Sequence, residues 1–396
     1  MRYRSLIIYS LLLLIINSCS KGGSNAPSTP PVSGPVISIN SISDNRNTTN
    51  SSFSFSVSMD KVSTSPVTVS YTTADGTAKS NTDYKPISGT LTILANTSSA
   101  SIDVTIIGDS TRKDNQTFSV QLSSPTNASL GTSKGTGTIL NENLLYFPVD
   151  STGYKTPNSY PGMNLFWSDE FNSKTVDKTF WTYETGAGGW GNSELENYTD
   201  RTQNSFVSNG NLIIEARQES LNGSNYTSAR MITKNKKIFT YGRIDIRAKM
   251  PKGKGLWPAL WMLGNNIDAV SWPACGEMDI LELLGQEPNK IYGTLHWGAT
   301  VQLHNSKSVS YLASSGSYDQ QFHVYSLIWS KDNVQILVDD VLYNTITGSN
   351  VGLPSPFNSD FFFIFNLAVG GSWPGAPDAT TVFPQRMVVD YVRIFK

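Results

Sequence analysis

Cysteine, histidine and charged residues are all scarce in this sequence. Its 396 residues include two cysteines and three histidines, and only 15% of them are charged. Two cysteines exclude a disulfide framework and a zinc site built from cysteines. The histidines, His296, His304 and His323, lack the close spacing of a catalytic metal motif. Thirty basic and thirty-one acidic residues give a net charge of −1, so the basic excess expected of a nucleic-acid-binding protein is missing.

A long hydrophobic run is also missing, although the N-terminus carries a short one. Arg2 and Arg4 precede an apolar stretch of residues 6–16, which at about 1.5 Å per residue is too short to cross a bilayer of about 30 Å. This pattern predicts a secretory signal peptide over residues 1–18. The stretch ends in Asn-Ser-Cys, which resembles a bacterial lipobox, and the resemblance implies lipidation of Cys19. We therefore expect an outer-membrane lipoprotein of the cell envelope, facing the exterior or the periplasm, anchored to the membrane by its N-terminus.

Composition divides the rest of the chain. Residues 19–35 are rich in Ser, Gly and Pro and predict a flexible linker. Residues 36–143 alternate apolar and polar residues with period two, and turn residues separate the runs, which predicts an antiparallel β-sandwich of about seven strands. All nine tryptophans follow residue 166. Residues 160–396 again read as strands with very little helix, so we expect an all-β chain with two sandwiches.

The segment GEMDILEL (276–283) carries the chemistry. Its acids alternate with apolar residues, so Glu277 and Asp279 share one face of a strand. Glu282 is an odd number of residues further on, and a β-bulge at Ile280 and Leu281 would return it to the acidic face. Three adjacent acids cannot all ionise easily, so at least one pKa is raised. One ionised carboxylate and one protonated acid are what glycoside hydrolysis requires.

Aromatic and glycine-rich segments surround this strand in the sequence. LWPALWML (256–263) precedes it, GGWGNSELENYT (188–199) forms a glycine-rich loop, and GGSWPG (370–375) forms another. Sugar-binding sites need aromatic faces for C–H surfaces and polar groups for hydroxyls. Without this context an ordinary solvated face would be the better interpretation of the acidic strand.

Two families resemble these segments. VSYTTADGTA (69–78), GTLTI (89–93) and GTILN (137–141) resemble a Calx-beta domain spanning 36–143. In GDSTRKDNQ (108–116), basic and amide residues replace the acids with which that family often binds calcium, so a spacer role is expected. FWSDEF (166–171), YGRIDIRAKMP (241–251), GEMDILEL, GTLHWG (293–298) and VVDYVRIF (388–395) resemble glycoside hydrolase family 16, and within it the laminarinase-like endo-β-1,3-glucanases.

The second resemblance implies a concanavalin-like β-jelly roll over residues 160–396 and a retaining mechanism. Glu277 would be the nucleophile, Glu282 the general acid/base, and Asp279 would modulate their protonation. Sugar-binding positions would be Trp190, Asn192, Arg230, Trp257, Trp261, His296 and Trp373. A structural calcium away from the catalytic face would use Glu170, Gly210 and Asp390, and catalysis needs no cofactor.

Some residues and alternatives remain outside this scheme. His304 and His323 are expected to be structural, and Cys275 to be a small buried residue. The expected partner is a β-glucan, bound by a monomer. The alternatives are a mixed-linkage β-glucan or a marine galactan as substrate, or a non-catalytic glucan-binding protein on the same fold. Loss of a catalytic acid would mark the last alternative, and all three acids are present.

Overall fold

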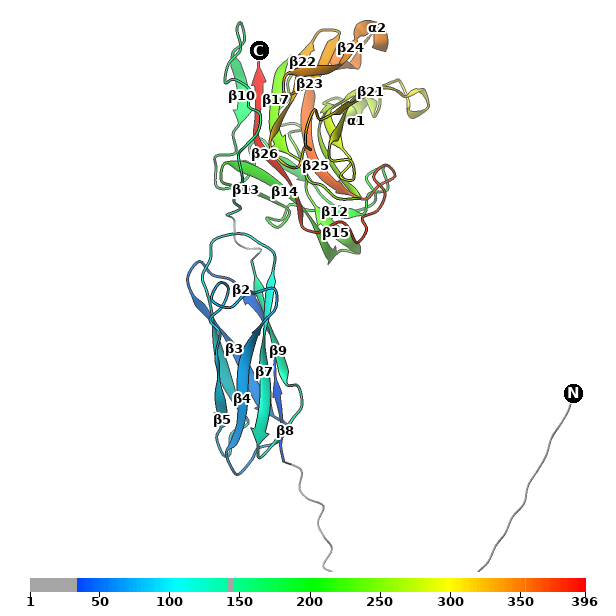
Figure 1. Ribbon diagram of the computed structural model, residues 1–396. Coiled ribbons are helices and arrows are strands. Elements are labelled where there is room, and N and C mark those ends of the chain that lie inside the picture. The colour runs from blue at the N-terminus through cyan, green and yellow to red at the C-terminus, as the bar shows by residue number, and fades with distance from the viewer. Residues whose placement is uncertain (1–33, 142–145, 353) are drawn as a thin grey trace, which may run out of the picture.

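The computed structural model describes residues 34–141, 146–352 and 354–396, which form two sandwiches joined end to end (Figure 1). The predicted signal peptide, Cys19 and most of the predicted linker lie outside these residues. Within the described ranges, no helix has the length and apolar character needed to cross a bilayer. The all-β prediction is confirmed: the α-helices described are two four-residue segments, α1 (Ile267–Val270) and α2 (Gly348–Val351).

The first sandwich packs a four-stranded sheet against a five-stranded sheet. The orders are β6-β3-β1-β8 and β2-β9-β7-β4-β5. Period-two alternation is clearest in β3, where every second residue from Phe53 to Met59 is buried. The strands are β1 (Val36–Ile39), β2 (Ile42–Asn45), β3 (Ser51–Met59), β4 (Val67–Asp75), β5 (Ser88–Ile93), β6 (Ser99–Ile106), β7 (Gln116–Thr126), β8 (Ser129–Leu130) and β9 (Lys134–Leu140).

Two details of this sandwich differ from the prediction. Nine strands are present in place of about seven, because the first apolar run bends at residues 40 and 41 into β1 and β2, and β8 is a two-residue strand. The pairings of β1 with β8 and of β2 with β9 are parallel, whereas the other pairings are antiparallel. Such short pairings leave little period-two signal in the sequence.

The second sandwich contains the remaining strands, two short 3-10 turns and both four-residue helices. Its strands are β10 (Leu165–Asp169), β11 (Thr182–Glu184), β12 (Glu196–Tyr198), β13 (Ser205–Ser208), β14 (Asn211–Leu221), β15 (Ser224–Ser228), β16 (Arg230–Ile232), β17 (Gly242–Lys249), β18 (Leu256–Gly264), β19 (Glu277–Leu283), β20 (Lys290–Trp297), β21 (Asn305–Leu312), β22 (His323–Ser330), β23 (Asn333–Val338), β24 (Val341–Thr347), β25 (Phe361–Val369) and β26 (Gln385–Phe395).

Two large sheets form this sandwich. The outer sheet has ten strands, with the path β12-β15-β14-β26-β17-β22-β23-β24, and β10 and β13 pair beside it. The inner sheet has seven strands in the order β11-β16-β25-β18-β19-β20-β21. The acidic strand β19 is thus near the middle of the inner sheet, where neighbours on both sides fix its backbone.

Each sandwich has its own hydrophobic core. The cluster between the large sheets includes Leu260 and Met262 of β18 and Phe363 and Phe365 of β25. A separate cluster fills the first sandwich. Because a β-strand turns alternate side chains to opposite faces, burial of Leu260 and Met262 turns Trp257 and Trp261 to the other face of the inner sheet.

A buried arginine joins the two sandwiches. Arg112, in the loop between β6 and β7, is 2% exposed. Its Nη2 donates to Oε1 of Glu215 on β14 at 3.2 Å and to the carbonyl of Gln203 at 3.0 Å. The guanidinium also lies 4.2 Å from the ring centroid of Phe206. The predicted spacer domain is therefore docked on the outer sheet of the second sandwich.

Candidate active site

The bulge predicted in the acidic strand is present. On β20, Asp279 pairs with Thr294 and Glu282 pairs with Tyr292, so two residues of β19 face one residue of β20. The extra residue shifts the parity of the strand. Glu277, Asp279 and Glu282 consequently line the same cleft, while Ile280 and Leu281 are fully buried.

A glycine and a tyrosine hydroxyl accommodate this bulge. Gly293 is the β20 residue opposite the two extra positions, and a Cβ atom there would lie 2.4 Å from the hydroxyl oxygen of Tyr343. That hydroxyl donates a hydrogen bond of 3.5 Å to the carbonyl of Ile280 within the bulge. Glycine is required here because of a close approach and not because of its backbone angles.

Two tryptophans donate hydrogen bonds to the outer acids. Trp272 Nε1 donates to Oε2 of Glu277 at 2.9 Å, and Trp257 Nε1 donates to Oε1 of Glu282 at 3.1 Å. Each indole N–H holds one oxygen of its carboxyl group, and the other oxygen of Glu277 faces His296. Sequence analysis missed Trp272, although it belongs to a Trp-Pro pair, as Trp257 and Trp373 do, and that repetition could have identified it.

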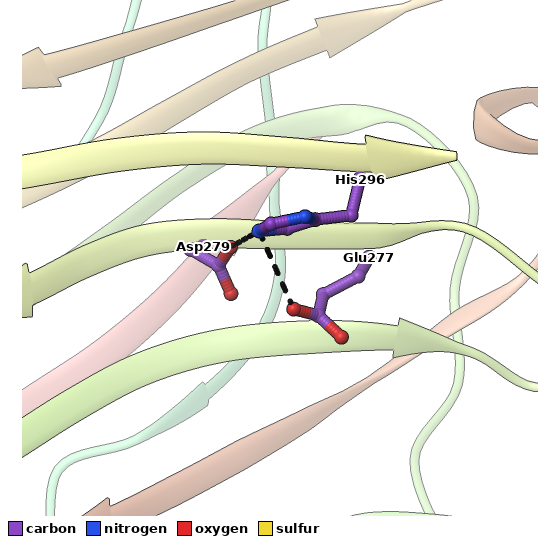
Figure 2. Close-up of side chains that lie close together, drawn as sticks. All are labelled: Glu277, Asp279 and His296. Carbon is purple, nitrogen blue, oxygen red and sulfur yellow. Dashed lines mark ion pairs between the residues drawn. The ribbon is translucent and has the colours of Figure 1, made fainter. Parts of the chain in front are cut away.

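A histidine, His296, lies beside Glu277 and Asp279, as Figure 2 shows. His296 pairs with Glu277 across β19 and β20. Its Nε2 lies 3.3 Å from Oδ2 of Asp279 and 3.8 Å from Oε1 of Glu277. Its Nδ1 lies 2.8 Å from Nε2 of His304. His304, which sequence analysis expected to be structural, lies beside the site: the chain returns after β20 and packs this ring against Trp272, with centroids 4.8 Å apart.

Burial raises the pKa of all three acids, and repulsion between them adds to this at Glu277 and Glu282. Burial, with the charge of Asp279 added, raises the pKa of Glu277 to about 8, and burial raises the pKa of Asp279 to about 8. Burial and the charges of both neighbours raise the pKa of Glu282 well above its usual range. Glu282 thus has the environment of a proton donor, as the clustering of acids predicted.

The acids form the floor of a cleft of about 470 Å³. Two residues that sequence analysis did not select, Glu194 and Asn366, also line it. The predicted sugar-binding residues that line this cleft are Trp190, Asn192, Arg230, Trp257 and Trp261. Trp373 lies beside it, 39% exposed, with its ring centroid 5.4 Å from that of Trp257.

Arg230 is held between aromatic and acidic neighbours. Its guanidinium carbon lies 5.1 Å from the ring centroid of Trp190 and 4.8 Å from that of Trp261. Its Nε donates to Oε2 of Glu184 at 2.5 Å. The arginine is fixed in place and its charge is balanced, so it can serve as a hydroxyl donor on the cleft wall.

A buried hydrogen-bond chain supports the Trp261 platform. Trp261 Nε1 donates to Oδ1 of Asn366 at 2.7 Å, and Nδ2 of Asn366 donates to the Tyr198 hydroxyl at 3.0 Å. That hydroxyl donates to Oε2 of Glu194 at 2.9 Å, and Asn192 Nδ2 donates to Oε1 of the same carboxylate at 3.0 Å. The glycine-rich loop is thus tied to the indole that faces the cleft, and core packing alone does not explain Trp261.

Two other expectations agree with the structure. Cys275 is buried and free, and burial raises the pKa of its thiol to about 11, so it is not poised as a nucleophile. His323 is buried on the outer sheet, where its Nδ1 lies 2.6 Å from Oδ2 of Asp339, in a structural position.

Arginines engage the carboxylates of the expected calcium site. Arg393 donates to both oxygens of Glu170 at 2.8 Å, and Nη1 of Arg247 lies 2.6 Å from Oδ2 of Asp390. Gly210 lies in the turn between β13 and β14, near this pair of acids. The arginines already balance both charges, so a cation would depend on backbone oxygens and the remaining Asp390 oxygen. Calcium at this place stays a prediction.

In the first sandwich, basic side chains likewise pair with clustered acids. Arg46 Nη2 lies 2.8 Å from Oδ1 of Asp83, and both side chains are almost fully buried. Lys113 Nζ lies 3.1 Å from Asp83 and 2.9 Å from Asp109. Lys113 belongs to the segment whose basic residues argued against calcium, and it occupies the position between the acids.

The cleft combines carboxyl groups of raised pKa with indole, amide and guanidinium groups. This combination is typical of an enzyme that hydrolyses polysaccharides. The chain belongs to the glycosyl hydrolases family 16, which residues 192–393 match. Residues 36–143 match the Calx-beta domain.

Individual relatives are consistent with this family. The chain is 39% identical over 271 residues to glucan endo-1,3-beta-glucosidase A1 of Niallia circulans, a match covering 62% of this chain but 40% of that protein. It is 41% identical to the beta-glucanase of Rhodothermus marinus, covering 60% of this chain and 86% of that protein. Among solved structures, the laminarinase catalytic domain of Thermotoga maritima is 47% identical, with a TM-score of 0.56, covering 59% of this chain and 98% of that domain.

Proposed function

We propose that the chain is a retaining endo-β-1,3-glucanase that acts on laminarin-type glucans. The observation that carries this proposal is the placement of Glu277 and Glu282 on one strand, each held by an indole N–H, on the floor of a cleft open to a polymer. Similarity to glucan endo-1,3-beta-glucosidase A1 and to a laminarinase catalytic domain supports the linkage.

The proposed mechanism gives each outer acid one role. Glu282 donates its proton to the glycosidic oxygen, while Glu277 attacks the anomeric carbon and forms a covalent glycosyl-enzyme. Glu282, now a carboxylate, takes a proton from the water that releases the sugar. Asp279 lies between them, and its charge raises the pKa of both neighbours. The sequence of steps uses two carboxyl groups and water, without a cofactor.

The charge of the cleft favours a neutral polymer over a sulfated one. In the part of the chain that the structure describes, Arg230 is the one lysine or arginine among the cleft-lining residues, and Glu184 balances it. Four acids line the same cleft. Among the lining residues that the structure describes, a sulfated galactan would find no cation free of a partner, so a neutral glucan fits better.

A product profile tests the proposal. The purified protein is incubated in parallel with laminarin, lichenan, agarose and carrageenan, and the products are separated by chain length. We expect a series of oligosaccharides from laminarin at the highest rate. Faster release from lichenan or agarose would overturn the β-1,3 assignment. Binding of laminarin without release of products would instead indicate a glucan-binding protein.

We also propose that Cys19 carries a lipid that anchors the enzyme in the cell envelope. The support is the short apolar run that ends at this cysteine and the Ser/Gly/Pro-rich segment after it. Cys19→Ala should move the protein from the membrane fraction to the soluble fraction or block its processing. Unchanged fractionation of the variant would contradict the anchor.

A further inference from the structure

The proposed mechanism leaves one buried carboxylate oxygen without a hydrogen-bond donor among the described residues. Asp279 is 3% exposed, and its Oδ2 accepts no hydrogen bond from the residues that the structure describes. The atom points toward Nε2 of His296, 3.3 Å away (Figure 2). A buried charged oxygen without a donor is costly, so this position favours a cation or a proton.

Three ligand atoms surround this point with the spacing of a metal site. Suitable atoms of Glu277, Asp279 and His296 all lie within 4.8 Å of one another. Two of the pairs, from Nε2 of His296 to the carboxylate oxygens, measure 3.3 and 3.8 Å. Tetrahedral zinc with bonds of about 2.0–2.2 Å places its ligand atoms roughly 3.3–3.6 Å apart. The two pairs that include His296 are within a few tenths of an ångström of this spacing. The two carboxylates need to approach each other by up to about 1.5 Å.

The second ring nitrogen of His296 is already held as zinc ligands require. Metal-binding histidines usually engage the other ring nitrogen in a hydrogen bond, which fixes the ring and its tautomer. Here Nδ1 lies 2.8 Å from Nε2 of His304. With the proton on Nδ1 donated to His304, Nε2 presents its lone pair to the acids. His304 is exposed and packs against Trp272, outside the three-residue set.

We propose that Glu277, Asp279 and His296 form an inhibitory site for Zn²⁺. Three protein ligands with a fourth position open to the cleft match the coordination of a zinc ion that keeps a water. The bound ion occupies an oxygen of the nucleophile and lies where the sugar ring must enter. Inhibition as a readout rests on the proposed glucanase function, whereas binding of the ion does not.

Calorimetry with ZnCl₂ tests the site directly. The chelator-treated protein at neutral pH should bind one Zn²⁺ per chain. His296→Gln removes a ligand and should weaken binding at least tenfold. His304→Asn should weaken it about tenfold through the ring orientation of His296, and this exposed position is safe for folding. The matched control is His323→Asn, which breaks a histidine–aspartate pair on the outer sheet and should leave the zinc affinity unchanged. Equal losses in His304→Asn and His323→Asn, or no saturable binding to the parent protein, would overturn the site.

Activity on laminarin provides the second readout. Zn²⁺ should inhibit in competition with substrate, EDTA should restore the rate, and Mg²⁺ at the same concentration should not inhibit, because it prefers oxygen ligands in an octahedral arrangement. Non-competitive inhibition with unchanged affinity in His296→Gln would place the ion elsewhere and contradict the proposal. If the metal-free protein does not hydrolyse laminarin, the proposed function fails, while calorimetry still decides the zinc site.

Discussion

The two sandwiches treat clustered acids in opposite ways. In the first sandwich, Arg46 and Lys113 lie between Asp83 and Asp109. Backbone N–H donors, together with the hydrogen bonds and charges of these cations, outweigh burial and lower the pKa of both acids, that of Asp109 to about 2. In the second sandwich, no lysine or arginine within the described ranges forms an ion pair with the three acids of β19, and their pKa values are raised. Acids that are paired stabilise a fold, and acids left unpaired keep protons that a reaction can use.

The largest expected effect is on catalysis. Glu277→Ala removes the nucleophile and should lower kcat on laminarin by roughly 10⁴-fold or more. Binding should remain, because Trp257, Trp261 and Arg230 still line the cleft. Initial rates and affinity electrophoresis in laminarin measure the two properties. A loss of less than tenfold would show that the unpaired acids of β19 are not the catalytic ones.

Glu282→Ala separates the two outer acids by role. Loss of the general acid/base should slow both steps by about 10²–10⁴-fold. Azide is already an anion, so it can attack the glycosyl-enzyme on Glu277 without a base and should partly restore turnover of a substrate with a good leaving group. For the parent protein, NMR of the early hydrolysis products should show the β-anomer first. The α-anomer appearing first would mean inversion and would reverse the assigned roles.

The corresponding change in the first sandwich should affect stability and not catalysis. Asp83→Ala leaves Arg46 buried without its partner and should cost about 3–5 kcal/mol in the unfolding of the first sandwich. Calorimetric scans should show one transition shifted to lower temperature and the other unchanged. The kcat on laminarin should match that of the parent protein. A large fall in kcat would show that the two sandwiches are functionally coupled through Arg112.

The smallest expected effect is that pH changes the unfolding temperatures of the two sandwiches in opposite directions. Asp109 has a lowered pKa in the folded protein, so its contribution to stability is present above its unfolded pKa near 4 and is lost as pH falls toward about 2. Glu277 has a raised pKa, so its contribution is fully present below about 4.5 and is lost as pH rises through about 8. Thermal scans in EDTA from pH 3 to 9 should show the first transition falling at the acid end and the second falling at the alkaline end. Parallel shifts of both transitions would contradict the comparison.

Patterns local in sequence allowed good predictions, and contacts between distant segments did not. Period-two alternation predicted the strand at Glu277, and the odd spacing of Glu282 predicted its bulge. Both features depend on neighbours along the chain. Trp272 and His304 were missed because a loop before β19 and a turn after β20 bring them to the acids. The basic residues at 112 and 113 were noticed, but sequence analysis could not foresee that one docks on Glu215 and the other pairs with Asp83.

The bulge in β19 also determines what a single-codon deletion would do to the active site. Deleting one codon at Ile280 or Leu281 would leave acids at alternate positions along a regular strand, still on one face. Glu277 and Glu282 already face His296 and Tyr292, four residues apart on β20. The spacing of the outer carboxyl groups along the strand would therefore stay the same, and Gly293 would face one residue in place of two. A single-codon deletion in the bulge can therefore straighten β19 while all three acids stay in the cleft, whereas the same deletion within β18 would turn Trp257 into the core.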